Sequence, residues 1–168
     1  RPRRVEARLD ATGGAVVLTG VHDGYAALAG VLHERRFVMD DQGLLLVLDT
    51  LSGRGVHTAE SRIHFAPDCR LTWSAEAPWR IDAEIDGARF NVLVPARGLE
   101  IEWGDGWYCP AFGVRRRTRV LLLRRRGPLP AAIAYCLGEA PQGELVLDER
   151  SGAVMLGGRS LWPRPVEG

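Results

Sequence analysis

The chain has 168 residues, of which 46% are hydrophobic and 26% are charged, and its formal net charge is +1. This length suits one domain with a substantial core, and the composition excludes a disordered chain. The small net charge excludes a global field that draws the protein to nucleic acid or to an anionic membrane. No apolar run approaches the roughly 20 residues that a membrane helix needs. We therefore expect no nucleic-acid or membrane partner.

The first residues, Arg1-Pro2-Arg3-Arg4, include no initiator Met and lack the apolar core of a signal peptide. We interpret residues 1–168 as a single domain that is a fragment of a longer chain. The three cysteines, Cys69, Cys109 and Cys136, are widely spaced and form no Cys-x-x-Cys pair, which argues against a zinc site. We expect three small buried side chains rather than a disulfide, although an oxidising compartment would permit one pair.

Short apolar segments separated by turn residues recur every 8 to 12 residues, a rhythm typical of β-sandwiches and barrels. We expect strands at 4–9, 15–19, 31–40, 43–50, 57–65, 70–75, 79–85, 88–95, 99–103, 106–114, 118–125, 131–137, 143–148 and 153–156. Tight turns are expected at Gly13-Gly14, Asp41-Gln42-Gly43, Asp86-Gly87, Asp105-Gly106 and Ser151-Gly152, because these residues tolerate positive φ.

Alternation favours strands over helices. In the segment 80–85 the apolar residues occupy the odd positions and charged residues the even ones, so one face is buried and the other solvated. The segments 44–48 and 120–123 are apolar on both faces, which predicts central strands covered on both sides. The one helix candidate, 25–32, is a turn or two at most. The sequence therefore predicts an all-β fold, an antiparallel β-sandwich of two packed sheets with little or no helix.

The segment from Val21 to Leu51 gathers most of the candidate site residues. His33 and Arg35 lie two apart on an expected strand, so they share a face and could bind a carboxylate or sulfate together. Arg36 points to the opposite face. We expect one of the two arginines to meet solvent or an acidic sugar and the other a carboxylate in the sheet; a purely structural salt bridge is the competing interpretation.

The cluster His22-Asp23-Gly24-Tyr25 precedes that strand. We expect Asp23-Gly24 to form a turn that His22 and Tyr25 cap, with Tyr25 as a candidate substrate contact. His57 and His64 lie seven apart, on opposite faces of one strand, so they are poor co-ligands for a metal.

Arginines bracket the apolar segment 120–123 at 115–117, 119 and 124–126. One interpretation is that they form charged ends that protect a sheet edge. The alternative is a groove that binds a polyanion, with Trp107 and Tyr108 as stacking platforms. We expect Trp73 and Trp79 to belong to the core or to a contact between the two sheets rather than to a sugar platform.

Three blocks of the sequence resemble the heparinase II/III-like family of bacterial polysaccharide lyases. The first comprises the His-Asp-Gly-Tyr cluster at 22–25, the His-x-Arg-Arg strand at 33–36, and the apolar strand that ends in Val47-Leu48-Asp49. The second is HTAESRIHFAP at 57–67, and the third is GWYCPAFG at 106–113, which is followed by Val120–Leu123 and Leu129-Pro130. The blocks occur in the family's order and cover most of the chain from His22 to Leu137.

The resemblance implies a C-terminal β-sandwich that accompanies an N-terminal α/α toroid, with eliminative cleavage of uronic-acid polysaccharides in the cleft between them. The family's Gly-His-x-His and His-Asn-Thr segments, which carry a catalytic His and hold a metal where one is present, are missing from this sequence. In the family they lie upstream of the first block. The resemblance therefore implies no catalytic residue, no metal and no cofactor within this chain, and places any divalent metal upstream in the parent protein.

The sequence thus predicts the sandwich portion of a polysaccharide lyase, which lines the cleft and braces the toroid but is inactive alone. The expected partners are an acidic polysaccharide and the toroid domain. The proposed contacts are His33, Arg35, Arg36, Tyr25, Trp107 and Tyr108. A non-catalytic carbohydrate-binding module or a structural sandwich is the alternative, and the bacterial compartment, periplasm or cytoplasm, stays open.

Overall fold

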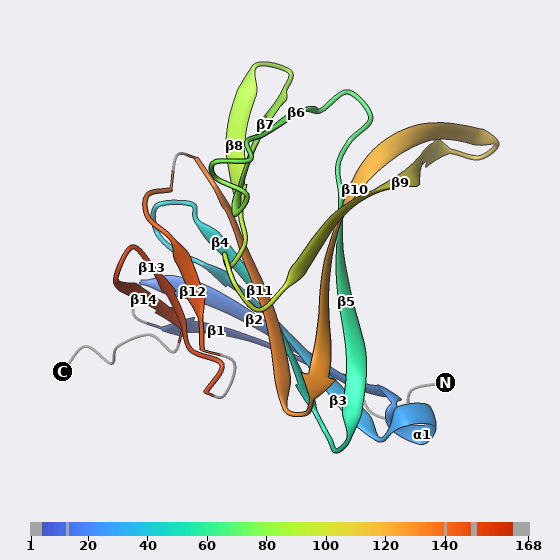
Figure 1. Ribbon diagram of the computed structural model, residues 1–168, viewed down its shortest axis with the longest axis vertical. Coiled ribbons are helices and arrows are strands. Elements are labelled where there is room, and N and C mark those ends of the chain that lie inside the picture. Colours follow the sequence, from blue (N-terminus) through green and yellow to red (C-terminus); the bar gives the residue numbers. More distant parts are fainter. Residues whose placement is uncertain (1–4, 13, 140, 149–150, 163–168) are drawn as a thin grey trace.

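The computed structural model describes residues 5–12, 14–139, 141–148 and 151–162, and these form an almost entirely β fold (Figure 1). The elements are β1 (Val5–Thr12), β2 (Ala15–Tyr25), α1 (Ala26–Ala29), β3 (Val31–Met39), β4 (Leu45–Ser52), β5 (Val56–His64), β6 (Arg70–Trp73), β7 (Arg80–Ile85), β8 (Ala88–Leu93), β9 (Glu100–Ala111), β10 (Val114–Pro128), β11 (Ala131–Gly138), β12 (Leu145–Leu147), β13 (Val154–Leu156) and β14 (Arg159–Trp162). The prediction of an all-β sandwich is confirmed.

The largest sheet has eight strands in the order β1-β2-β3-β4-β11-β8-β7-β6. Every neighbouring pair is antiparallel, and β11 returns from the C-terminal half of the chain to lie between β4 and β8. A three-stranded sheet in the order β5-β10-β9 and a smaller one in the order β12-β13-β14 complete the fold. The small third sheet was not expected as a separate layer. Its strands β12 and β13 lie within the expected segments 143–148 and 153–156, whereas β14 was not predicted.

The eight-stranded sheet is covered on both faces, which explains the unbroken apolar run of β4. Val47 points to the side of the β5-β10-β9 sheet, where it joins a core with Leu121 and Leu123 of β10. Leu46 and Leu48 point to the other side, where they pack with the β12-β13-β14 sheet. Side chains alternate across a strand, so a strand buried on both faces must be apolar at every position. The prediction that 44–48 forms a central strand covered on both sides is confirmed.

β10 is central in its sheet, and its two faces are buried to different extents. Leu121 and Leu123 are fully buried against the large sheet, whereas Leu122 on the opposite face is only half-buried. Val120, on the same face as Leu122, is only 3% exposed. The expected cover on both sides of 120–123 therefore holds at Val120 and is incomplete at Leu122.

Asp105-Gly106 is not a turn. It lies within β9, which runs unbroken from Glu100 to Ala111, and Gly106 has no positive φ. A Cβ on Gly106 would lie 2.6 Å from Cγ2 of Val120, so the glycine permits close packing of β9 on β10. The expected strands 99–103 and 106–114 are thus one strand and part of the turn that follows it.

The other expected turns contain residues with positive φ, as predicted. Gly43 has φ 79° and Gly152 φ 71°, and Asp86-Gly87 joins β7 to β8 with φ 50° and 81°. Gly14 has φ 69°, while Gly13 lies outside the described residues, as does the first residue of the expected strand 4–9. The helix has only four residues, so no helix in the described part of the chain is long enough to cross a bilayer.

The three cysteines are all free thiols. Cys136 is buried and Cys69 is half-buried, as small core side chains. Cys109 is exposed, contrary to the expectation, because it lies on the outer part of β9 beyond the core.

Candidate functional site

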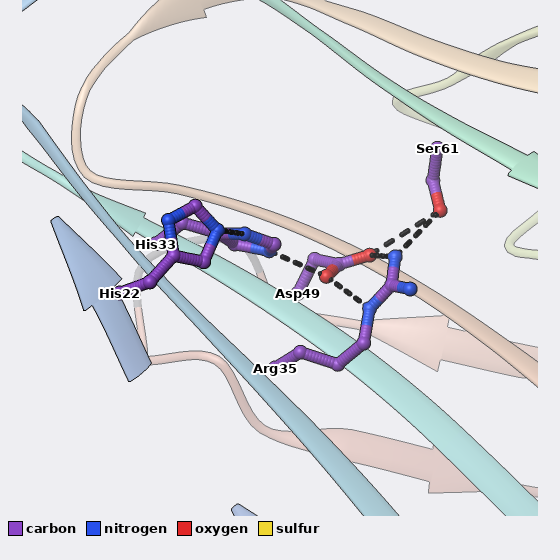
Figure 2. Close-up of polar contacts among 5 residues, drawn as sticks. All are labelled: His22, His33, Arg35, Asp49 and Ser61. Carbon is purple, nitrogen blue, oxygen red and sulfur yellow. Dashed lines mark hydrogen bonds and ion pairs between the residues drawn. The ribbon is translucent and has the colours of Figure 1, made fainter. Parts of the chain in front are cut away.

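The residues of the first sequence block meet on one face of the large sheet, where β2, β3 and β4 lie side by side. Arg35 on β3 pairs directly with Asp49 on β4, and His33 lies two residues away on the same face of β3. His22 on β2 pairs with His33. Figure 2 shows that these four side chains form one continuous chain of polar contacts that ends at Ser61 of β5. The expected shared face of His33 and Arg35 is confirmed.

The Asp49 carboxylate is the centre of this network. Arg35 Nε donates to Oδ1 and Arg35 Nη2 donates to Oδ2, each at 2.7 Å, in a bidentate ion pair. His33 Nε2 lies 2.7 Å from Oδ1, and Ser61 Oγ donates to Oδ2 at 3.3 Å. Since Ser61 belongs to the three-stranded sheet, the network also links the two sheets of the sandwich.

Asp49 stays ionised although its side chain is only 5% exposed. Burial by itself raises the pKa of the Asp49 carboxyl. The hydrogen bonds from His33 and Arg35, together with the charge of Arg35, outweigh burial and hold that pKa below its ordinary value. The same hydrogen bond to Asp49 raises the pKa of the Arg35 guanidinium. The pair is therefore a fixed anion and cation.

The hydrogen bonds assign one tautomer to each imidazole. The backbone N–H of Gly24 donates to Nδ1 of His22 at 3.1 Å, so that nitrogen carries no proton. His22 Nε2–H then donates to Nδ1 of His33 at 2.9 Å, and His33 Nε2–H donates to Asp49. The direction is fixed at both ends, by an amide that can only donate and a carboxylate that can only accept. The predicted turn at Asp23-Gly24 is wrong: both residues lie within β2, where the pairing with β3 shifts register between His22 and Tyr25. His22 instead accepts the Gly24 amide across this irregularity.

This arrangement leaves no ring nitrogen free to take a proton from a substrate. Both nitrogens of His22 and both nitrogens of His33 are engaged within the protein. A general base needs a lone pair directed at its substrate. The chemistry that the network supports is therefore positioning and anion binding.

Tyr25 lies at the rim of the network, half-exposed. Its ring centroid is 5.3 Å from that of His22 and 6.4 Å from that of His33. Tyr25, His33, Arg35, Asp49 and Ser61 all line a cavity of about 260 Å³ between β3, β4 and the start of β5. The Nη1 group of Arg35 is used by none of the contacts to Asp49 or Ser61, and the Arg35 side chain is 37% exposed. It is the donor in this cavity that an acidic ligand would meet.

The remaining candidates lie elsewhere. Arg36 points to the opposite face of the sheet, where it pairs with Glu34 and its Cζ lies 4.9 Å from the ring centroid of Trp162. Trp107 and Tyr108 lie on β9 and, as adjacent strand residues, point to opposite faces of the β9–β10 hairpin. The structure thus brings together Tyr25, His33 and Arg35, and separates them from the other three.

The sequence alone predicts no role for Asp49 or Ser61. The signal for Asp49 is a carboxylate at the end of an apolar strand, directly across from an arginine once the pairing of β3 and β4 is known. Ser61 carries no local signal, because its contact comes from a strand of another sheet. Within the described residues no group of three His, Cys, Asp or Glu side chains is arranged to hold a metal ion.

The outer half of β10 carries a second concentration of charge. Arg115, Arg117 and Arg119 lie against the rings of Trp107 and Trp103, with Cζ-to-centroid distances of 4.0 Å for Arg115 and 5.5 Å for Arg117 to Trp107, and 5.2 Å for Arg119 to Trp103.

Comparison with known proteins bears on both regions. The sequence matches the family described as heparinase II/III-like, C-terminal, over residues 1–160. No curated protein sequence matches the chain.

Solved structures with the same fold include a mutant of heparan sulfate lyase HepC from Pedobacter heparinus, with TM-score 0.73 and 11% identity over 94% of this chain and 27% of that one. The BT4657 gene product, a heparinase III with methylated lysines, has TM-score 0.70 and 14% identity over 95% of this chain and 27% of that one. A further heparinase III has TM-score 0.67 and 9% identity over 94% of this chain and 26% of that one.

The chain therefore spans about a quarter of the length of these solved structures. At such low identities they establish the shared fold, whereas the family match rests on the sequence. From that match, this chain belongs to the heparinase II/III-like family, as its C-terminal region.

Proposed function

We propose that the chain is the C-terminal β-sandwich of a polysaccharide lyase that cleaves uronic-acid-containing polysaccharides by β-elimination. The observation that carries the proposal is the family match over residues 1–160. The lengths of the similar solved structures support a longer parent, in which a separate toroid domain completes the cleft. The names of those proteins, heparan sulfate lyase and heparinase III, support an acidic polysaccharide as substrate.

β-Elimination requires a base for the proton beside the uronic carboxylate, an acid for the leaving oxygen, and positive charge that stabilises the enolate. In this chain, His22 and His33 have no free ring nitrogen, so they are poor candidates for the base. Arg35 Nη1 can donate to a uronic carboxylate, and the Tyr25 hydroxyl at the rim can donate beside it. We assign to this domain the binding and orientation of the acidic sugar, and to the toroid the groups that transfer protons. Any divalent metal would belong to the upstream part of the parent.

One observation favours a second role, as a structural sandwich that packs on a partner domain. Leu9, Val16, Leu18 and Met39 are 69%, 50%, 40% and 41% exposed and form two cross-strand pairs on β1, β2 and β3. A contiguous apolar surface of this kind is typical of an interface. The two roles are compatible, because bracing of the toroid uses this apolar surface and lining of the cleft uses the Arg35 cavity.

The test compares the chain with a longer protein that carries it. Both are incubated with heparan sulfate and with alginate, and the absorbance of unsaturated uronates is followed. We expect product from the longer protein and none from the chain. Product from the chain would contradict the assignment of proton transfer to the toroid, and no product from the longer protein on any uronic polymer would contradict the lyase.

Within the active longer protein, Tyr25→Phe tests the contact at the rim. We expect a higher KM, with kcat reduced less. Leu28→Ala is the matched control, because Leu28 is 91% exposed on α1 beside Tyr25 and contacts none of the network. Equal effects of the two changes would argue against a Tyr25 contact.

A further inference from the structure

The outer half of the β9–β10 hairpin carries a regular array of arginine and tryptophan on one face. Arg117 pairs directly with Trp107 across the two strands, and Leu121 pairs with Trp103. Arg115, Arg117 and Arg119 follow one another at alternate positions of β10, so they line one side of the strand. We call these five residues, Arg115, Arg117, Arg119, Trp103 and Trp107, the Arg–Trp strip.

The strip has positive charge that the protein itself does not neutralise. The one ion pair that it makes among the described residues joins Arg117 to Asp105, at 3.9 Å between two largely exposed side chains. Arg115 and Arg119 contact tryptophan rings and have no carboxylate partner in the described part of the chain. Like charges placed side by side on a sheet are unfavourable. Stability of the isolated fold therefore does not account for the strip.

The opposite face of the same hairpin shows the contrast. Arg116 makes a bidentate ion pair with Asp68, with distances of 3.1 and 2.6 Å. This hydrogen bonding lowers the pKa of Asp68 and raises that of Arg116. Neighbouring arginines on β10 therefore differ in their contacts. Arg116 on one face has a carboxylate partner, whereas the N–H groups of the strip arginines on the other face remain available to a ligand.

Aromatic contacts restrict the side chains of the Arg–Trp strip. Trp103, at its base, lies 5.9 Å from the ring centroid of Phe65 and 6.2 Å from that of Trp73. Both Arg115 and Arg117 lie over Trp107, which restricts their guanidinium groups. Such preorganisation lowers the entropy cost of binding an anion. Figure 1 shows the hairpin arching away from the large sheet, and Phe112 at its tip is fully exposed.

The strip is remote from the Arg35 cavity. That cavity includes Thr58 of β5, which pairs with Arg126 of β10. Nine residues of extended strand separate Arg126 from Arg117, which corresponds to about 30 Å. A single monosaccharide cannot reach both places, whereas a polymer can.

We propose that the Arg–Trp strip is a binding site for a linear anionic polysaccharide, whose carboxylate or sulfate groups accept hydrogen bonds from the three guanidinium groups. The charge complementarity favours a polyanion, and the near-zero net charge of the whole chain confines the attraction to this patch. The ring of Trp107 is covered by two guanidinium groups, so it is a poor platform for a nucleic-acid base. The site goes beyond the proposed lyase role, because it needs no catalytic group and lies outside the Arg35 cavity.

The test measures binding of the chain to fluorescently labelled heparin, polygalacturonate, neutral dextran and oligothymidylate at two salt concentrations. The strip variant is Arg115→Gln, Arg117→Gln and Arg119→Gln combined. The matched control is Arg62→Gln, Arg70→Gln and Arg116→Gln combined, which removes the same charge from exposed arginines outside the strip. Circular dichroism and thermal midpoints confirm that each variant folds.

We expect the wild-type chain to bind heparin and polygalacturonate but not dextran, more weakly at high salt. The strip variant should lose at least tenfold in affinity and the control less than twofold, with Trp107→Leu between them. Equal losses in both triple variants, or no binding by the wild type, would overturn the site. Tighter binding of oligothymidylate, lost in the same variant, would replace the glycan with a nucleic acid.

If the strip variant does not fold, a second variant provides the test. The corresponding triple Arg→Lys variant keeps the charge but loses the planar guanidinium groups that stack on the rings. We expect several-fold weaker binding, and affinity equal to that of the wild type would overturn the role of stacking. These measurements follow binding to the chain and not lyase activity. The chain can therefore show no binding while the longer protein is an active lyase, and it can bind while the longer protein is inactive.

Discussion

Arg35 and Asp49 face each other across β3 and β4 and form two parallel hydrogen bonds of 2.7 Å, Nε to Oδ1 and Nη2 to Oδ2. The carboxylate is almost fully buried, while the guanidinium keeps one edge toward a cavity. One ion pair thereby stabilises the sheet and presents a donor to a ligand.

Asp49→Asn should destabilise the fold by about 3 kcal/mol, because it leaves the half-buried Arg35 without its anion and replaces one accepting oxygen by an amide nitrogen that cannot accept a hydrogen bond. The measurement is the free energy of unfolding in urea at neutral pH. Asp41→Asn is the control, since Asp41 is an exposed turn residue, and it should change stability by less than about 0.5 kcal/mol. Similar losses from both changes would contradict the central place of Asp49.

The contribution of Asp49 to stability should depend on pH in a defined direction. Its pKa is lowered in the folded protein, so the folded state favours the ionised form more than the unfolded chain does. The stabilisation is therefore fully present above about pH 4, the unfolded pKa, and is lost as the pH falls through the lower folded value. Unfolding curves of the wild type and Asp49→Asn should converge in this acidic range. A constant difference down to pH 2 would contradict the prediction.

Each of the two histidines should carry a proton on Nε2 and none on Nδ1, as the chain of hydrogen bonds requires. Nitrogen chemical shifts of the imidazoles in NMR spectra report the tautomer directly. His22→Ala removes the acceptor for Gly24 and should cost about 1 kcal/mol. His57, which binds the carbonyl of Arg54 and takes no part in the network, provides the control as His57→Ala. An Nδ1-protonated His33 would contradict the assignment.

Thiol reactivity should distinguish the three cysteines. Burial raises the pKa of the Cys136 thiol to about 12 and also raises that of Cys69. Since the thiolate is the reactive form, Cys109 should react rapidly with iodoacetamide in the native protein while Cys136 reacts only after unfolding. Mass spectrometry of the labelled peptides checks this order. Rapid native labelling of Cys136 would show that the core around β11 opens.

The sequence contains enough information to predict individual strands, but not to predict which residues of other strands they contact. The alternation in β7 and the apolar run in β4 predict strands correctly, since each pattern reports how many faces a strand buries. The same reasoning fails at Asp105-Gly106, because a glycine that permits positive φ and a glycine that permits close packing look alike in a sequence. Which applies depends on Val120, a neighbour in another strand.

The candidate site shows the same limit. Spacing alone places His33 and Arg35 on one face, and their shared face follows from the period of a strand. The sequence does not show that Nε and Nη2 of Arg35 are paired while Nη1 is not. This depends on the register of β3 against β4 and on Ser61, which a separate sheet contributes. Likewise, the sequence shows a run of arginines at 115–117. Only the tertiary structure reveals that Arg116 pairs with Asp68, which lies between β5 and β6, and that its neighbours stack on a tryptophan of β9.

By itself, then, the sequence determined an all-β sandwich, the family, and the strand faces that carry charge, because these follow from local periodicity and from motifs that are continuous in the chain. Only the tertiary structure decided which charges are neutralised. Ion pairing is set by distances between strands that are remote in sequence, such as Arg116 and Asp68, and the unpaired guanidinium edges that could meet an acidic polysaccharide are what remains after those contacts are made.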